Sequence, residues 1–123
     1  MLYSILIFGS EERVAAWSAQ ENSEVMDRHA ALRAQLTEQQ RLGPVIRLSP
    51  NESKVVRRKR GLVRITDGPF AETKEQLMGM YIVECATLED AVAATELLDF
   101  ETGVFEIVPL KFLGGGRLPD LVR

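Results

Sequence analysis

Cysteine and histidine are almost absent from this 123-residue chain, which contains one of each, Cys85 and His29. A single cysteine cannot form an intrachain disulfide. One thiolate and one imidazole are too few ligands for a cysteine-based or histidine-rich metal site. The sequence also lacks a phosphate-binding glycine loop and a serine nucleophile elbow. We therefore expect no metal and no cofactor, and a buried, inert Cys85 rather than a nucleophile.

Long apolar runs are also missing, and no segment is long enough to span a membrane. The apolar opening segment, residues 1–8, has neither a basic region before it nor a small-residue cleavage site after it, so it does not have the pattern of a signal peptide. These absences predict a cytoplasmic protein with no membrane partner.

Positive charge is not in excess, because 15 Lys and Arg residues face 18 Asp and Glu residues and the formal net charge is −3. Binding to nucleic-acid phosphates requires clustered positive charge, so we expect no nucleic-acid partner. The local exception is Arg57-Arg58-Lys59-Arg60, which is followed by Gly61 and flanked by β-type residues. This pattern is typical of a hairpin turn with solvated charges. A contact with an anion or a nucleic acid is the alternative interpretation.

The hydrophobic periodicity predicts alternating strands and helices along the chain. The expected elements are a strand at 2–8, a short helix at 11–17, a longer helix at 21–41, a strand at 45–48, a hairpin at 54–56 and 62–66, a strand at 77–85, a helix starting at 88 and a strand at 104–112. With the hairpin set aside, this is the βαββαβ pattern of ferredoxin-like α+β domains. We expect one domain at residues 1–112 and a flexible tail at 113–123, which begins near three consecutive glycines.

The first expected strand is apolar on both faces. Alternation places Leu2, Leu6 and Phe8 on one face and Tyr3, Ile5 and Ile7 on the other. A strand with two apolar faces must be covered on both sides. Helices of the same domain are able to cover one face, so a partner subunit is the expected cover of the other.

The segment Thr66–Leu77 has the sequence TDGPFAETKEQL. It resembles the signature of the DGPF-domain family, the YCII-related proteins, and the similarity extends over roughly residues 2–110. The resemblance implies a small bacterial protein with a ferredoxin-like fold, paired as a homodimer in a dimeric α+β barrel. Met78-Gly79 stands where the family commonly has paired glycines. Because methionine is bulkier than glycine, a pocket lined by this position would be smaller here or differently shaped.

In YCII-related proteins a histidine on the first helix and an aspartate near a strand start are the proposed active-site pair, and these resemble His29 and Asp67 here. From the residues alone, His29 shares a helical stripe with Val25, Leu32 and Leu36, and therefore faces the sheet. It is either a core histidine with one hydrogen bond or, beside a carboxylate, a group that transfers a proton.

Asp67 is open to two interpretations as well: an aspartate that bonds its own backbone in a turn, or a carboxylate held by the rigid Gly68-Pro69 loop. Phe70 either caps the core or forms a wall of the pocket. Tyr81, in the middle of a strand, is expected to direct its hydroxyl into the dimer cavity. We therefore take His29 and Asp67 as candidate catalytic residues, and Gly68, Pro69, Phe70 and Tyr81 as candidate substrate-binding residues.

Two functions remain open on these grounds. The first is a cofactor-free enzyme of the lyase, isomerase or hydrolase type, in which His29 and Asp67 act on a small organic acid. The second is a non-catalytic protein, either a module that binds a small molecule or an accessory protein. The resemblance implies the accessory role, because DGPF proteins often look like companions of sigma factors in stress regulation. A purely structural dimer is a third possibility. The sequence specifies neither the ligand nor the reaction.

Overall fold

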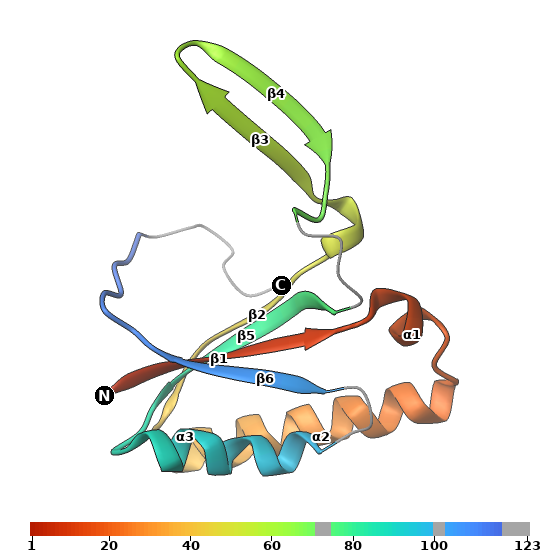
Figure 1. The fold of residues 1–123 in the computed structure, drawn as a ribbon. Coiled ribbons are helices and arrows are strands. Elements are labelled where there is room, and N and C mark those ends of the chain that lie inside the picture. The colour runs from red at the N-terminus through yellow and green to blue at the C-terminus, as the bar shows by residue number, and fades with distance from the viewer. Residues whose placement is uncertain (71–74, 100–102, 117–123) are drawn as a thin grey trace.

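Strand β1 (Leu2–Gly9) lies inside a four-stranded antiparallel sheet, between β5 (Gln76–Glu84) and β6 (Val104–Pro109) (Figure 1). Strand β2 (Leu42–Arg47) pairs with the other side of β5, so the sheet order is β2-β5-β1-β6. The computed structural model describes residues 1–70, 75–99 and 103–116. The element order and the antiparallel sheet are those of the ferredoxin-like α+β fold that the sequence predicts.

Helices α2 (Ala19–Glu38) and α3 (Leu88–Ala94) cover one face of the sheet, and the short α1 (Glu11–Ala15) lies near one end of it (Figure 1). The start of α2 is a capping box. The hydroxyl of Ser18 accepts from the backbone N–H of Glu21 at 3.1 Å, and the Glu21 carboxylate accepts from the backbone N–H of Ser18 at 3.2 Å. These reciprocal bonds satisfy two helix-end donors, and α2 starts at Ala19, two residues before the predicted start at 21.

The core lies between the helices and the covered face of the sheet. Register places Ile5 of β1 opposite Tyr81 of β5 and Ile107 of β6 on this face. The buried residues of the core are Tyr3, Ile5, Ile7, Leu32, Leu36, Tyr81, Val83, Cys85, Ala91 and Leu98. Cys85 is thus buried, as expected, and burial raises the pKa of its thiol.

The opposite face of the sheet is apolar and only partly covered within the subunit. Leu6 and Phe8 are half-buried, whereas Ile46, Val104 and Val108 are exposed. This confirms that β1 has two apolar faces. The name open face is used below for this side of the sheet.

A hairpin of β3 (Lys54–Lys59) and β4 (Leu62–Asp67) forms a separate two-stranded sheet and projects away from the body, opposite α2 and α3 (Figure 1). The predicted hairpin is therefore present but longer than expected. Only Arg60 and Gly61 form its turn, with φ of 49° and 82°. The rest of the basic run lies in β3 rather than in the turn, because charged side chains are tolerated on a strand whose faces are solvated.

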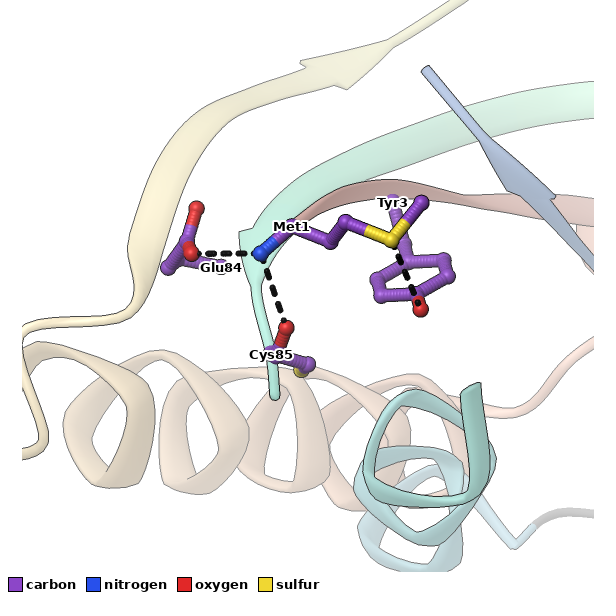
Figure 2. Close-up of polar contacts among 4 residues, drawn as sticks. All are labelled: Met1, Tyr3, Glu84 and Cys85. Carbon is purple, nitrogen blue, oxygen red and sulfur yellow. Dashed lines mark hydrogen bonds and ion pairs between the residues drawn. The ribbon is translucent and has the colours of Figure 1, made fainter. Parts of the chain in front are cut away.

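The N-terminus is joined to the end of β5 (Figure 2). The ammonium group of Met1 donates to the Glu84 carboxylate at 2.7 Å and to the carbonyl of Cys85 at 3.1 Å. The hydroxyl of Tyr3 donates to the sulfur of Met1 at 3.6 Å. Thus the first residue bridges the start of β1 and the chain reversal that leads to α3.

Several predicted boundaries differ from the structure. Helix α2 ends at Glu38 rather than near residue 41, because Gln40 adopts a positive φ of 57°. Strand β2 begins at Leu42 and includes Gly43-Pro44, where a register shift interrupts its pairing with β5. This is compatible with the position of β2 at the edge of the sheet, where a proline is tolerated.

Helix α3 also differs from its predicted packing. Leu88 and Val92 are exposed, whereas Ala91 and Leu98 are buried. Residues 95–98 form a 3-10 turn, which changes the direction in which later side chains point. Residues 71–74 of the signature segment and 117–123 of the expected tail lie outside the described residues.

Candidate functional site

A cavity of about 150 Å³ lies between the covered face of the sheet and α2, next to α1. Most of its lining is apolar. The lining residues are Ile7, Phe8, Gly9, Val14, Trp17, Val25, Met26, His29, Arg33, Val45, Ile46, Arg47, Met78, Gly79 and Tyr81. A dry cavity of about this volume accommodates a benzene molecule, so the space is sufficient for a small organic ligand.

His29 and Tyr81 form a hydrogen-bonded pair in the wall of this cavity. Nδ1 of His29 is 2.7 Å from the hydroxyl oxygen of Tyr81. Their rings are stacked, with centroids 5.8 Å apart and an angle of 27° between the planes. His29 is half-buried on α2, whereas Tyr81 is buried on β5. The hydroxyl of Tyr81 thus points to the helix side of the sheet.

The surroundings favour the neutral forms of both rings. Burial lowers the pKa of His29 below its ordinary value of 6.5, and the positive charges of Arg33 and Arg47 lower it further. Burial raises the pKa of Tyr81, while a hydrogen bond from Arg33 and its charge act in the opposite direction. At neutral pH the pair is therefore an uncharged imidazole and an uncharged phenol.

The direction of the His29–Tyr81 hydrogen bond depends on the tautomer of His29. A neutral imidazole has one donor and one acceptor nitrogen. Where Nδ1 accepts the phenol hydrogen, the imidazole proton resides on Nε2.

The cavity is electropositive next to the histidine. Arg33 follows His29 by one helical turn on α2, and Arg47 lies at the end of β2. The described residues that line the cavity include no aspartate and no glutamate. An anionic ligand group would therefore find two cations and no competing carboxylate there.

Met78 and Gly79 of β5 form part of the cavity wall on the side of the sheet. A register shift between Ile7 and Phe8 leaves Met78 without a pairing partner in β1, and its side chain contributes to the lining. Gly79 lies directly against the backbone of Ile46, where an added Cβ would overlap the carbonyl oxygen. The sequence predicts that methionine in place of glycine makes a pocket lined by this position smaller or differently shaped, and Met78 does line the cavity.

Asp67 is the last residue of β4, at the base of the hairpin. Its carboxylate forms an ion pair and a hydrogen bond with Lys54, the residue opposite it on β3. This bond holds the pKa of Asp67 below its ordinary value. The side chain of Asp67 is 86% exposed, and the described cavity lining contains none of residues 66–70. Within one subunit His29 forms a hydrogen bond with Tyr81, and a catalytic pairing of His29 with Asp67 stays a prediction.

The loop after Asp67 is anchored to the residues before β3. The backbone N–H of Gly68 donates to the carbonyl of Ser53 at 2.9 Å, and the Gly68-Pro69 peptide bond is cis. Phe70 is 74% exposed, so its expected role as a cap on the core is wrong for the isolated subunit. The guanidinium of Arg57 lies over its ring, 5.3 Å from the centroid, which is a cation–π distance.

Sequence reasoning missed both arginines of the site. Arg33 was detectable, because a spacing of four places it on the same helix face as His29. Arg47 carried no such signal, since its position depends on the pairing of β2 with β5. Trp17, the last residue of the predicted short helix at 11–17, is part of the cavity lining.

Two other features would bear on function in the part of the chain that the structure describes, a metal centre and a membrane-spanning helix. Within residues 1–70, 75–99 and 103–116, no group of three or more His, Cys, Asp or Glu side chains is arranged to hold a metal ion. No described helix is both long and apolar enough to cross a membrane.

The fold and the cavity define a ferredoxin-like α+β domain with one histidine in an apolar, electropositive pocket. Residues 1–113 match the model of the YCII-related domain, and the chain belongs to that family. It is 40% identical, over 98% of its length, to the whole of an uncharacterized protein from Rhizobium meliloti (strain 1021). The comparisons thus fix the family and assign no reaction.

Proposed function

We propose that the protein is a cofactor-free enzyme that binds a small organic acid in the cavity and uses His29 to move a proton. The observation that carries this proposal is the His29–Tyr81 hydrogen bond in the wall of an apolar cavity, beside Arg33 and Arg47. General acid–base catalysis by a positioned histidine serves reactions of the lyase, isomerase and hydrolase types.

The protonation state supports this role. A histidine with a lowered pKa is neutral at pH 7, and a neutral imidazole is able to exchange a proton with a ligand. Tyr81 acts as a positioning residue, because its hydrogen bond and its stacked ring hold the imidazole in one orientation. Preorganised acid–base groups require less rearrangement during a reaction.

The chemistry of the lining supports the class of ligand. Arg33 and Arg47 supply positive charge for a carboxylate, and the aliphatic and aromatic side chains contact an apolar body. With a cavity of about 150 Å³, the ligand is a monocarboxylate whose body is about the size of a benzene ring.

The role of Asp67 in this proposal is to orient His29 from outside the cavity of its own subunit. The exposed Asp67–Lys54 pair is weakly held, so the carboxylate is available to a second subunit. Gly68, Pro69 and Phe70 would then approach the same cavity as part of that loop. We propose a homodimer for this reason, and because the open face presents Ile46, Val104 and Val108 to solvent.

The test of ligand class is a proton NMR titration of the single histidine with benzoate and with benzamide, its neutral analogue. Benzoate should bind and raise the pKa of His29, because an adjacent anion stabilises the imidazolium. Arg33→Gln should weaken that binding by about tenfold, a loss of about 1.4 kcal/mol. Arg28→Gln, an exposed change on the same helix, is the control and should not. Equal binding of benzoate and benzamide would refute the anion site.

The test of catalysis is proton exchange. A carboxylate with an acidic C–H bond, incubated with the protein in deuterium oxide, should gain deuterium at that carbon, and His29→Gln should abolish the gain while ligand still binds. Asp67→Asn should slow exchange if the aspartate orients His29. Binding without exchange in the wild-type protein would favour the alternative, a non-catalytic binding or accessory protein linked to sigma-factor regulation.

A further inference from the structure

The β3–β4 hairpin, residues 54–67, is called the arm here. It stands clear of the sheet and the helices (Figure 1). Register places Val56 opposite Ile65 and Arg58 opposite Val63 on one of its faces. Val56, Val63 and Ile65 are 50%, 47% and 64% exposed. The arm therefore displays an apolar strip along its length, although an isolated two-stranded hairpin is only marginally stable in water.

The charge of the arm is opposite to that of the rest of the chain. The arm contains six basic residues and one acidic residue, Asp67, a formal charge of +5. Because the whole chain carries −3, the remainder carries −8. Residues 84–110 alone contain seven acidic residues and no lysine or arginine. The described acidic side chains in that stretch, which are Glu84, Glu89, Asp90, Glu96, Asp99 and Glu106, are all exposed.

The direction of the arm selects the surface that it is able to reach. It rises on the side of the sheet opposite α2 and α3, which is the side of the open face (Figure 1). A second copy stacked on the open face would lie beside the arm. Of the acidic residues, Glu106 of β6 shares the open face with Leu6, its register partner.

We propose that the arm of each subunit grips a second copy of the chain, with Val56, Val63 and Ile65 against that copy and the arm cations facing its exposed acidic residues in 84–99 and at Glu106. This interface rests on the homodimer proposed above and adds the segment that clamps it. The apolar strip decides against a nucleic acid as the partner, because phosphate contacts would leave Val56, Val63 and Ile65 in water. Opposite charges on the two surfaces favour encounter of the copies and fix their register.

The direct test is zero-length crosslinking between isotopically distinct subunits. Unlabelled and ¹⁵N-labelled protein are mixed, allowed to exchange and treated with a carbodiimide. Lys54 shares the face of the apolar strip, and Lys59, near the tip, lies on the other face, so the two lysines together report on both faces of the arm. Mixed-isotope crosslinks from at least one of them to an acidic residue in 84–99 or to Glu106 are expected. Crosslinks of both lysines only within a single isotope would overturn the proposal.

The second test compares the two faces of the arm. Val63→Thr with Ile65→Thr keeps β-branched side chains but removes apolar surface, and should weaken dimerisation by about tenfold or more. Leu62→Thr, on the opposite face and 75% exposed, is the matched control and should leave the dimer unchanged. Light scattering over a dilution series measures both, and circular dichroism confirms that the fold is intact.

The outcomes separate this inference from the dimer itself. A wild-type dimer that neither variant weakens would refute the arm and leave the open-face dimer standing. A wild-type protein that is monomeric at all concentrations would refute both. Binding of a labelled DNA duplex that Arg57→Ala with Arg58→Ala abolishes, without any effect on dimerisation, would overturn the choice of a second copy as the partner.

Discussion

A single hydrogen bond joins Nδ1 of His29 on α2 to the hydroxyl of Tyr81 on β5 across 2.7 Å. It connects the longest helix to an inner strand of the sheet, and it forms part of the cavity wall. The bond therefore contributes to stability and also holds the imidazole whose pKa is lowered by burial, Arg33 and Arg47, and its effects on stability and on that pKa are separable by experiment.

Removing the hydroxyl should affect both properties. Tyr81→Phe leaves the partners of the phenol without their hydrogen bond, so we expect a loss of about 1–3 kcal/mol in the free energy of unfolding. Where the phenol donates to Nδ1, the bond stabilises the neutral imidazole, so its loss should raise the pKa of His29. Urea denaturation and an NMR titration measure the two effects.

Tyr3→Phe is the matched control for that substitution, since Tyr3 is the only other tyrosine. Its hydroxyl bonds to the sulfur of Met1, which is a weak acceptor. The cost should be smaller and the pKa of His29 unchanged. Equal losses of unfolding free energy in the two variants would show that the His29–Tyr81 bond contributes no more to stability than the Tyr3–Met1 bond.

Stability should depend on pH through His29. Its pKa is about 6.5 in the unfolded chain and lower in the folded protein, so the unfolded state binds the proton first as the pH falls. The contribution is therefore complete above pH 6.5 and is lost as the pH drops through the folded pKa. His29→Gln should flatten this part of the profile, measured as the difference in unfolding free energy between the two proteins. Parallel profiles down to pH 4.5 would contradict the lowered pKa.

Gly79 should tolerate no side chain. Gly79→Ala places a methyl group against the carbonyl of Ile46 on the neighbouring strand, which forces β2 away from β5. We expect a loss of about 1–3 kcal/mol, the usual range for overpacking. Gly115→Ala has open space around the added carbon and serves as the control. Thermal unfolding of the two variants is the measurement, and similar melting temperatures would argue against the close approach of the strands.

Met78 should limit the size of the ligand. Met78→Ala enlarges the cavity at the wall facing α2, so a bicyclic carboxylate such as naphthoate should gain affinity relative to benzoate. Isothermal titration of both carboxylates with both proteins gives the ratio. A ratio that does not change would show that Met78 does not bound the occupied part of the cavity.

The fold was largely predictable because its signals are local. The capping box at Ser18 and the apolar stripe of Val25, Leu32 and Leu36 fix α2. The two apolar faces of β1 predict a strand that needs cover on both sides of the sheet. The predicted boundaries were wrong where a local signal competes with strand pairing. Gly43-Pro44 is typical of the end of a helix but lies within β2 here.

The candidate site was less predictable, since it depends on contacts between distant elements. His29 was found by its helical stripe, and Tyr81 by its place in mid-strand. Their contact, across 52 positions of sequence, depends on which face of β5 meets α2, and the register shift near Phe8 affects that relationship. The sequence predicts Asp67 as the hydrogen-bond partner of His29, but in the structure Asp67 bonds to Lys54.

The sheet order has a consequence for how the chain folds. Tyr3 pairs with Val83 in β5 and with Pro109 in β6, so β1 finds both neighbours only after most of the chain has been synthesised. Such distant pairings require costly loop closure and slow the folding of a domain. Helix α2, by contrast, has its capping box and its apolar stripe within its own sequence. Refolding should therefore show early helix formation followed by a slower phase in which the sheet closes around β1.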